Sequence, residues 1–575
     1  MNYDVIVVGL GTAGCIAAVA AGRCGASVLA LEKGTYPGGL QTGGFIQEYF
    51  LQKPLGIAEE LELKAQKLFE QSGDFAVVTE AKKYVLEQAM LEAGCKICYG
   101  NRLVSVIKKG KRVVGIVRFE QGVEFQEFAN TIIDSTADAF VAMLADCSLS
   151  YGRALDHRIQ HSAVLFLCRE RKNGKDVYCG NNNAFRENPN SISAFSKRML
   201  QALAWCLKEN HFQKRIATFS EQPGIREGAR IIPRTPLTIN DFLLNSSEKD
   251  IIAYAETSFD TCVTDLAFES EGYLDAALIA EIRGERFCFP IAMQNIFPRE
   301  VDGLVVAGRN IGLDYDMGKA VRMNAAMSWI GESAGILAAL AGKKGIIPNQ
   351  ISYEELSPLL QLTKPEVQNP LSLQPLSDRE LEQRLNSNIP GDAIWSAYRY
   401  RKNAFLKKFF VKAAVPGKIY AAFALALLRE RMVLPFLRNI LEESLEARDE
   451  FAEYGYKAVY LIGRFHDKEA IPILKKILLH AVAEPDFDYH TYRNPEEVKY
   501  LYHSHSLLAL MKIGQAHSEC RIAVASILSC YIKRNIPLRN RFFSWNPTCL
   551  VRMEQPLQEL IRKTLKRWKM EKTNN

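Results

Sequence analysis

The chain has 575 residues, of which 48% are hydrophobic and 24% are charged. This length predicts two to four domains, and this composition is typical of a soluble globular protein. No apolar run approaches about 20 residues without a polar interruption, so we expect no membrane span. Met1–Asp4 lacks the basic region of a signal peptide, and we therefore expect a cytoplasmic location.

Positive charge is concentrated near the C-terminal end. The net charge is +7, and residues 531–575 carry eleven Lys or Arg against three Glu, a surplus of +8 that leaves −1 for the remainder. Because the rest of the chain has no basic excess, we expect no nucleic-acid partner. Leu557, Ile561 and Trp568 belong to an apolar stripe with basic residues largely on the other side. We interpret this segment as a helix that caps its neighbours; the alternative is a helix that binds anionic membranes or acidic partners.

A strand–turn–helix pattern opens the chain. The apolar run Asp4–Val8 ends in G-x-G-x-x-G at Gly9, Gly11 and Gly14, and a helical pattern follows at Cys15–Gly22. The first glycine permits a tight turn, the second lets the backbone approach a pyrophosphate, and the third lets the helix pack against the strand. The N-terminus of the helix offers N–H groups to the phosphates. This pattern predicts a dinucleotide site.

The following elements alternate between strand and helix. A second strand, Ser27–Leu31, ends at Glu32, which lies at the spacing of an acid that binds an adenosine ribose. Beyond the glycine-rich stretch Pro37–Gly44, apolar periodicity predicts further helices and strands. The expected helices are Ala58–Gln71, Lys82–Ala93 and Ala325–Leu340, and the expected strands are Leu103–Ile107, Arg112–Phe119, Thr131–Ile133 and Leu304–Val306. The fold class is therefore α/β, with a Rossmann-like FAD/NAD(P)-binding domain and an inserted substrate domain.

Helical patterns dominate from about Asp392 onward. Three windows look like imperfect repeats: Tyr420–Glu443, Tyr456–His480 and His505–Leu528. Each helix of such a repeat has one apolar stripe, which is buried only when neighbouring repeats stack. The windows resemble HEAT-like repeats, and such an array is a candidate surface for a protein partner.

Three features favour FAD over NAD. The glycine pairs within Pro37–Gly44 suit a close backbone approach along a diphosphate and a flavin ring. The strand-like segments Leu103–Ile107 and Ile132–Asp138 return to the same core. Gly308 and Arg309 follow a late strand, and a helix comes soon after. This layout is typical of flavoproteins whose FAD domain is assembled from both ends of the module.

At these residues the chain resembles the FAD-dependent oxidoreductase family related to the succinate dehydrogenase and fumarate reductase flavoproteins. The resemblance covers about residues 1–365 and rests on several short segments. These are Gly9–Gly14, Glu32, Pro37–Gly44, Asp134–Asp138, Ile225–Ile231, Leu304–Asn310 and Gly331–Gly335.

The resemblance implies how FAD is held. The glycine turn would hold the pyrophosphate, Glu32 the ribose and the Val104 backbone the adenine edge, while residues after two later strands would line the diphosphate and the flavin. The predicted cofactor-binding residues are Gly9, Gly11, Gly14, Glu32, Lys33, Gly38, Gly39, Thr42, Gly43, Val104, Thr136, Ala137, Asp138, Gly308 and Arg309.

The resemblance, the change in composition after Gly342 and the later helical patterns together predict the domain boundaries. We expect a discontinuous FAD-binding domain of residues 1–150 and 295–345 and a substrate or cap domain of residues 151–294. A connecting region of residues 346–391 then leads to an all-α HEAT-like domain of residues 392–575.

The chain departs from the family pattern at three places. Ala137 replaces a glycine in the run Asp134–Asp138, the segment Phe289–Gln294 lacks a Tyr-Arg pair after its proline, and Tyr315 stands where a histidine is common.

Missing residues narrow the chemistry further. No second G-x-G-x-x-G occurs in the module, so a separate NAD(P)H domain is not expected. No cysteine lies between Cys24 and Cys95, which disfavours a disulfide reductase, and Cys95–Cys98 has no partners for a metal site. Because the first histidine is His157, we expect FAD to be non-covalent, and because Cys95 and Cys98 lack further ligands, we expect no metal.

Arginines are the candidates for the substrate site. Arg226 and Arg230 are four residues apart, on one face if helical, and Arg322 precedes a helix near the expected flavin. Arginines clamp a carboxylate and polarise a reacting bond. The alternative is a structural ion-pair cluster with Glu227. His157 and His161 are either general bases or structural residues.

The sequence therefore predicts an FAD-dependent oxidoreductase that transfers a hydride between FAD and a small organic substrate. Two alternatives remain open. In one, the helical repeats carry the function and the flavin domain is a scaffold or redox sensor. In the other, the basic tail directs flavin-dependent modification of nucleic acid.

Overall fold

The structure is a computed structural model in which the chain forms two compact units. It describes residues 2–47, 49–72, 76–170, 176–185, 191–208, 214–244, 249–259, 266–282, 286–367, 375–446, 452–479, 495–541, 550–552 and 554–570. The N-terminal unit comprises Met1–Cys262 and Gly284–Asn369, and the helical unit comprises Val263–Arg283 and Pro370–Asn575.

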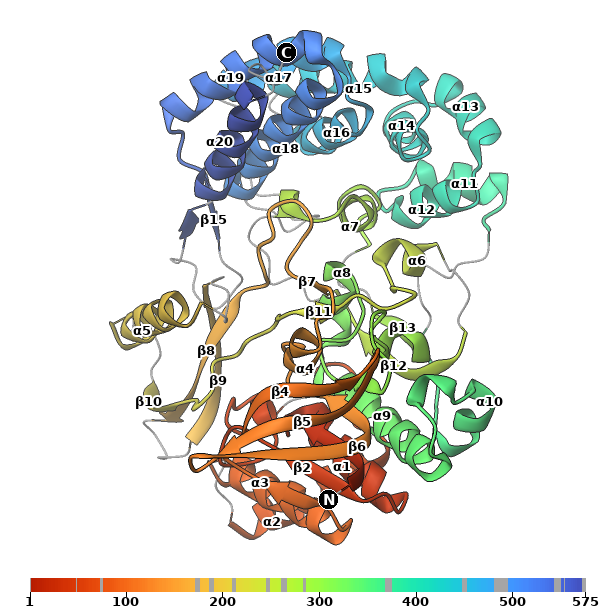
Figure 1. Cartoon of the computed structure of the whole chain (residues 1–575). Coiled ribbons are helices and arrows are strands. Elements are labelled where there is room, and N and C mark those ends of the chain that lie inside the picture. The colour runs from red at the N-terminus through yellow and green to blue at the C-terminus, as the bar shows by residue number, and fades with distance from the viewer. Residues whose placement is uncertain are drawn as a thin grey trace. The chain divides into compact units, whose positions relative to one another are not determined.

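A mixed sheet forms the centre of the N-terminal unit (Figure 1). Its strands are β1 (Asn2–Val8), β2 (Val28–Leu31), β3 (Lys96–Cys98), β4 (Arg102–Lys109), β5 (Arg112–Glu120), β6 (Val123–Asp134) and β14 (Leu304–Val306). The order is β3-β2-β1-β6-β5-β4, and β14 also pairs with β6. The first half of β6 pairs with β5 in antiparallel fashion, whereas its second half runs parallel to β1 and β14. The predicted α/β fold class is confirmed, as are the strands expected in these places.

Two helices rich in small residues pack closely on this sheet. They are α1 (Thr12–Arg23) and α9 (Asn324–Lys344). A Cβ atom at Gly331 would lie 2.2 Å from the carbonyl oxygen of Ala13, and one at Gly335 would lie 2.3 Å from that of Ala17. Gly331 and Gly335 therefore allow the backbones of α9 and α1 to come into contact.

A helical hairpin, α2 (Gly56–Ser72) and α3 (Ala76–Glu92), lies between β2 and β3 in the chain. The backbone N–H of Ile57 donates to Glu332 Oε2 at 3.0 Å, so an acid on α9 satisfies the N-terminus of α2. A Cβ at Gly22 of α1 would lie 2.3 Å from the Ala93 carbonyl oxygen, which places the end of α3 against α1. Both predicted helices are confirmed.

Smaller elements complete the N-terminal unit. Three small sheets are formed by β8 (Ser162–Glu170), β9 (Asp176–Phe185) and β10 (Lys214–Phe219), by β7 (Leu149–Ser150) and β11 (Arg230–Ile231), and by β12 (Ile251–Thr257) and β13 (Phe287–Ala292). The remaining helices are α4 (Phe140–Leu144), α5 (Ile192–Lys208), α6 (Ile239–Leu243), α8 (Tyr315–Val321) and α10 (Tyr353–Leu356).

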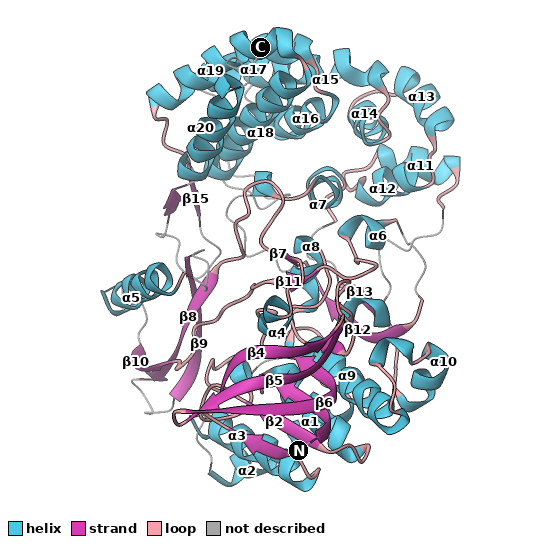
Figure 2. Ribbon diagram, in the orientation of Figure 1, coloured by secondary structure: helices cyan, strands magenta, loops and turns pink. Residues whose placement is uncertain are grey.

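The helical unit is built almost entirely of helices (Figure 2). They are α7 (Glu271–Leu274), α11 (Asp378–Leu385), α12 (Gly391–Arg399), α13 (Asn403–Lys412), α14 (Gly417–Leu427), α15 (Leu434–Glu446), α16 (Ala452–Phe465), α17 (Ile471–Leu479), α18 (Pro495–Ala516), α19 (Arg521–Arg534) and α20 (Glu554–Met570), with one strand pair, β15 (Arg539–Arg541) and β16 (Leu550–Arg552). Each repeat window falls on a helix pair joined through a short 3₁₀ turn. The pairs are α14–α15, α16–α17 and α18–α19.

The basic C-terminal helix α20 packs within this unit. Leu557, Ile561 and Trp568 are buried, and the indole N–H of Trp568 faces Gln515 Oε1 of α18 at 3.4 Å. The apolar stripe is therefore covered by the preceding helices, as the capping interpretation predicts.

A segment that lies between β12 and β13 in the chain belongs to the helical unit. It contains α7 and a π-helix, Asp275–Ile279. Tyr460 donates to Asp275 Oδ1 at 2.7 Å, and Lys512 donates to Glu271 Oε1 at 2.7 Å. Sequence patterns gave no sign that Val263–Arg283 joins the helices after Pro370. The expected domain boundaries stay a prediction.

One described helix, α9, is long and apolar enough to cross a membrane. Of its apolar window, 83% is buried inside the protein, because α9 is the core helix that packs on α1.

The α1–α9 contact gives a direct test of the fold. Replacing Gly335 with Ala forces a methyl group against the Ala17 backbone, and we expect a loss of about 1–3 kcal/mol in the free energy of unfolding, measured by denaturant titration. Gly318→Ala in α8 is the control, because its Cβ would meet Arg230 Cδ at an ordinary 3.8 Å. Equal stability of the two variants would contradict the close contact.

Candidate functional site

The site is set by four parallel strands that end at the same level. Val8 of β1 pairs with Leu31 of β2 and with Asp134 of β6, and Asp134 pairs with Val306 of β14. The residues that follow β1, β6 and β14 continue this alignment. Gly9 N donates to Leu31 O at 2.8 Å, Ser135 N to Val8 O at 2.9 Å, and Ala307 N to Asp134 O at 2.9 Å. Four turns therefore lie side by side at the carboxyl edge of the sheet, where α/β folds bind ligands.

The glycine turn has the geometry of a diphosphate cradle. Gly9 has φ +92°, and a Cβ there would lie 2.6 Å from Ser135 O. A Cβ at Gly14 would lie 1.9 Å from Gly9 O. At Gly11, the N-cap of α1, a Cβ would meet no protein atom within 4 Å. The first and third glycines are thus required by the protein itself, whereas the second faces open space at a helix N-terminus.

Glu32 holds the turns on either side of it. Its Oε2 accepts from Leu10 N and its Oε1 from Gly34 N, both at 2.8 Å. Its own carbonyl accepts from Asn101 N at 3.0 Å, and β4 begins at the next residue. The half-exposed Val104 therefore lies shortly after a segment that is bonded to Glu32. Lys33, the residue after Glu32, is exposed.

The loop Pro37–Gly44 lies against the glycine turn. Gly38 N donates to Leu10 O at 2.8 Å, and a Cβ at Gly39 would lie 3.0 Å from Gly11 Cα. Thr42 is fully buried and donates to Pro37 O at 2.7 Å, which closes the loop on itself. Gly43 packs on Tyr36, whose hydroxyl would lie 2.0 Å from a Cβ there.

A buried acid organises the turn after β6. Asp134 Oδ1 accepts from the Thr136 hydroxyl at 2.7 Å, and Oδ2 accepts from Ala142 N at 3.0 Å. Asn310 Nδ2 reaches the same carboxylate at 3.3 Å. Burial raises the pKa of Asp134, against the effect of these hydrogen bonds. Asp134 thus ties the turns after β6 and β14 together.

The next residues join the cofactor edge to the arginine segment. Arg309 Nη2 donates to Asp138 Oδ1 at 3.1 Å, and Nη1 donates to Ile225 O at 2.8 Å. A Cβ at Gly228 would lie 1.8 Å from Asp138 Oδ1. The segment Ile225–Arg230 therefore runs directly beside the turns after β6 and β14.

The three candidate arginines converge on one segment, Gly152–His161. Arg226 Nη1 donates to His161 O at 2.8 Å, Arg322 Nε donates to Gln160 Oε1 at 3.1 Å, and Arg230 Nη2 donates to Gly152 O at 3.2 Å. The segment that carries Arg226 has no helical structure and Arg230 begins strand β11, so the helical face considered for the two residues does not exist.

Arg230 is committed to the protein interior. It is buried, forms an ion pair with the buried Glu227, and donates from Nε to Leu313 O at 3.2 Å. Glu227 also accepts from Gly152 N at 3.0 Å and from Gln160 N at 2.7 Å. The structural ion pair that the sequence left as an alternative is therefore present at Arg230.

Sequence reasoning missed Gln160 as part of this arrangement. Its backbone is held by Glu227 and its side chain meets Arg322, so it links two arginines that are 92 positions apart in the sequence. Of the histidines considered as bases, His157 is exposed with φ +60°, whereas His161 is buried. No local pattern marks Gln160.

Buried charges also surround helix α8. Asp314 caps the helix by accepting from Met317 N at 2.8 Å, and it accepts from Ile239 N at 2.7 Å. Burial and then the nearby charge of Asp316 raise the pKa of Asp314 to about 6. Asp316 pairs with the fully buried Lys319 at 2.7 Å, and that ammonium lies over the Tyr315 ring. The position where the family often has histidine is thus part of a buried charged cluster.

These residues fit a dinucleotide. The open side of Gly11, the start of α1 and the carboxylate of Glu32 have the donors, the space and the acid that such a ligand requires. Among the described residues, no group of three or more His, Cys, Asp or Glu is arranged to hold a metal ion.

Comparison with known proteins gives matches to flavin enzymes. A sequence model described as FAD dependent oxidoreductase matches residues 4–201 and 181–360. The vinyl phenol reductase of Lactiplantibacillus plantarum is 38% identical over 78 residues, which cover 13% of this chain and 15% of that enzyme.

Two solved structures that match this chain at low sequence identity are named for a reductase-like protein and a halogenase. A geranylgeranyl bacteriochlorophyll reductase-like protein of Thermoplasma acidophilum is 13% identical, with 75% of this chain and 98% of that chain covered and a TM-score of 0.33. A myxobacterial FAD-dependent chondrochloren halogenase is 12% identical, with 75% and 97% covered and a TM-score of 0.33.

The family match spans more than half of the chain, and it includes the four turns at the carboxyl edge of the sheet. FAD is therefore the cofactor that these turns imply, and the chain belongs to the FAD-dependent oxidoreductase family.

Proposed function

We propose that the N-terminal unit transfers a hydride between non-covalently bound FAD and a small organic acid. The observation that carries this proposal is the convergence of Arg226, Arg230 and Arg322 on Gly152–His161, beside the Asp138–Arg309 contact. Two of these guanidinium groups, those of Arg226 and Arg322, would suit a substrate with a carboxylate beside the proposed flavin site.

The proposed FAD contacts follow from the four turns. Gly11 and the start of α1 would receive the diphosphate, and Glu32 would bind the ribose. The adenine would lie near Val104. The diphosphate and flavin side would be lined by the residues of the other three turns, namely Gly38, Gly39, Thr42, Gly43, Thr136, Ala137, Asp138, Gly308 and Arg309.

In the proposed reaction, FAD supplies the acceptor or donor of the two electrons and the hydride. The chain binds and orients the other reactant. Arg226 is half-buried and extends from the segment that touches Asp138, so it is placed to bind a carboxylate. Arg322 is held by Gln160 and would bind a second oxygen. Arg230 is a positioning residue, because Glu227 occupies its guanidinium and fixes Gln160.

The finer relationships are also proposals. The segments that resemble succinate dehydrogenase and fumarate reductase flavoproteins support descent from that group. Three helix pairs joined by 3₁₀ turns support a HEAT-like array that binds a protein partner. The described cysteines Cys15, Cys95 and Cys147 are free and buried, which supports a reducing, cytoplasmic location.

Ala137 stores backbone strain in the proposed FAD site. It has φ +67°, a left-handed conformation that favours glycine, and it stands where the related family has glycine. Its strain is maintained by the surrounding turn, which Asp134 holds through Thr136.

The diphosphate assignment predicts that Gly11→Ala folds normally but binds FAD at least tenfold more weakly. Gly11 has φ −78° and its methyl group would meet no protein atom, so only the ligand would meet it. Titration of apoprotein with FAD, followed by flavin fluorescence, gives the Kd, and Gly318→Ala is the control. A wild-type Kd for Gly11→Ala would reject this placement of the diphosphate.

The substrate assignment predicts that an organic acid bleaches the bound flavin in the absence of oxygen. Dicarboxylates, hydroxy acids and sugars are screened by absorbance. For the acid that reacts, we expect Arg226→Gln to raise the concentration needed for half-maximal bleaching rate by about 10- to 100-fold, the value of one or two charge-assisted hydrogen bonds. Arg234→Gln is the control, because that side chain is exposed and pairs only loosely with Asp302 at 3.5 Å. Bleaching by sugars alone would contradict the carboxylate assignment.

The strain at residue 137 predicts that Ala137→Gly raises the free energy of unfolding of the apoprotein by up to about 1 kcal/mol, after the entropy cost of glycine is subtracted. Ala145→Gly is the matched control, because Ala145 has φ −86° and should lose stability. Differential scanning calorimetry measures both. A loss at both positions would show that the left-handed turn is not strained.

A further inference from the structure

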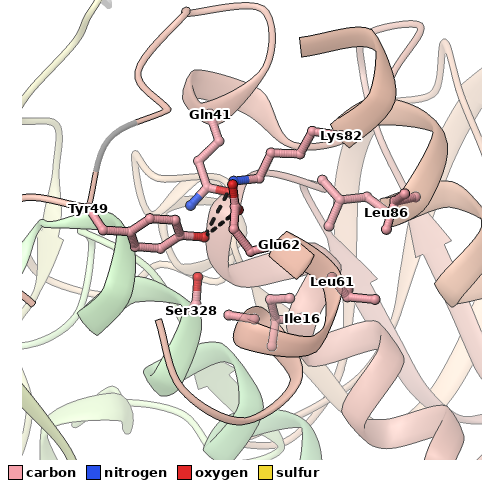
Figure 3. Close-up of a pocket in the computed structure, with 10 residues that line it drawn as sticks. Ile16, Gln41, Tyr49, Leu61, Glu62, Lys82, Leu86 and Ser328 are labelled. Carbon is pink, nitrogen blue, oxygen red and sulfur yellow. Dashed lines mark hydrogen bonds and ion pairs between the residues drawn. The ribbon is translucent and has the colours of Figure 1, made fainter. Parts of the chain in front are cut away.

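A charged cluster built around the buried Lys82 lies behind the loop Pro37–Gly44 (Figure 3). Lys82 of α3 donates to Glu62 Oε2 of α2 at 2.5 Å and to the Tyr49 hydroxyl at 3.3 Å. The Tyr49 hydroxyl in turn donates to Glu62 Oε2 at 3.0 Å. Lys82 is only 4% exposed, so its ammonium depends on these two partners for the solvation that water would otherwise provide.

The cluster opens onto a small cavity that also contains a buried amide. The cavity has a volume of about 10 Å³, close to the space of one water molecule. Gln41 is 3% exposed and lies close enough to the Tyr49 hydroxyl to lower its pKa, but its Nε2 atom has no partner at hydrogen-bond geometry. Figure 3 shows this amide reaching from the loop to the side of Tyr49 and Glu62. A buried amide rarely persists unpaired, because the desolvation of its N–H groups must be compensated.

Gln41 belongs to the loop that borders the proposed cofactor. Gly39, two residues earlier, lies against Gly11, and Gly38 is bonded to Leu10. On the opposite side, α3 supports the loop, since a Cβ at Gly38 would lie 3.0 Å from Leu86 Cδ1. Lys82 and Leu86 are one helical turn apart on α3, so the same face of this helix supports both the loop and the cluster.

Burial and the charge of Glu62 act on the pKa values of Lys82 and Tyr49, which indicates that the cluster fixes the geometry of its surroundings. Burial lowers the pKa of Lys82, whereas the charge of Glu62 raises it. Burial and the same carboxylate raise the pKa of Tyr49. A buried ion pair often adds little net stability compared with apolar residues of the same volume, but it fixes one arrangement of the groups around it. The arrangement fixed here is the back of the FAD-side loop.

We propose that Tyr49, Glu62 and Lys82, together with one water molecule that binds Gln41 in the cavity, position the loop Pro37–Gly44 for FAD. The water would accept from Gln41 Nε2 and donate to the Glu62 carboxylate. The three side chains are positioning residues, because they act on FAD through the loop. The inference rests on the proposed function, in which this loop lines the cofactor.

The test separates loop positioning from general stability. Lys82→Met leaves Glu62 and Tyr49 without their cation, and we expect both a lower melting temperature of the apoprotein and an FAD Kd raised at least tenfold. The double variant Glu62→Met/Lys82→Met removes the whole pair. Its melting temperature should return toward the wild-type value, but its Kd should stay raised and the flavin absorption spectrum and midpoint potential should differ from wild type.

Two further variants sharpen the result. Lys64→Met is the control, because it removes the same charge from an exposed pair with Glu60 on α2. Gln41→Met removes the amide with little change in volume. If the amide merely lacks a partner, this variant gains stability and keeps its FAD Kd; if the amide is held by water, the Kd rises.

The outcomes decide the inference separately from the proposed function. Wild-type Kd, spectrum and potential in the double variant would overturn the positioning role. If Lys82→Met or the double variant does not fold, Gln41→Met decides, and an unchanged Kd there overturns the inference. If Gly11→Ala weakens FAD binding while the cluster variants do not, the proposed site stands and only this inference fails.

Discussion

The common level at which β1, β2, β6 and β14 end is the constraint on which the rest of the site depends. Parallel pairing fixes Val8, Leu31, Asp134 and Val306 side by side, so the strand ends already bring the four following turns together before the contacts between the turns are counted. A shift of one residue in one strand would turn its side chains to the opposite face and move its turn away from the others. The glycines, the buried Asp134 and Glu32 then refine an arrangement that the sheet already imposes.

Buried charge gives the second level of order. Glu227 binds Arg230 and two backbone N–H groups, so the segment Gly152–His161 is fixed beside the turn of Asp138. Glu62 and Lys82 form a second pair, behind the loop Pro37–Gly44. In both places an acid pairs with a buried base whose charge would be costly to bury alone. The net free energy of unfolding that such a pair contributes is therefore a different property from its effect on the position of neighbouring groups.

The turns of the proposed nucleotide site could be placed from the sequence, because their signals are local. The glycines at positions 9, 11 and 14 and the acid at position 32 lie within one βαβ unit, where spacing reports geometry directly. The arginine site could not be predicted in the same way. Its partners Gln160 and Glu227 are brought together by tertiary contacts, and the helical spacing of Arg226 and Arg230 was a wrong guide because that segment is not helical. The membership of Val263–Arg283 in the helical unit likewise depends on contacts between residues far apart in the sequence, such as Tyr460 and Asp275, which are 185 positions apart.

The most direct test of the central claim is hydrogen–deuterium exchange of the apoprotein with and without FAD. The account predicts slower exchange on FAD binding in four segments, Gly9–Gly14, Pro37–Gly44, Asp134–Asp138 and Ala307–Asn310, because the ligand contacts backbone groups in all four turns. Helices α16 and α18 of the helical unit should exchange at unchanged rates. Protection confined to the helical unit, or absent from the turns after β6 and β14, would contradict an FAD site assembled from both ends of the N-terminal unit.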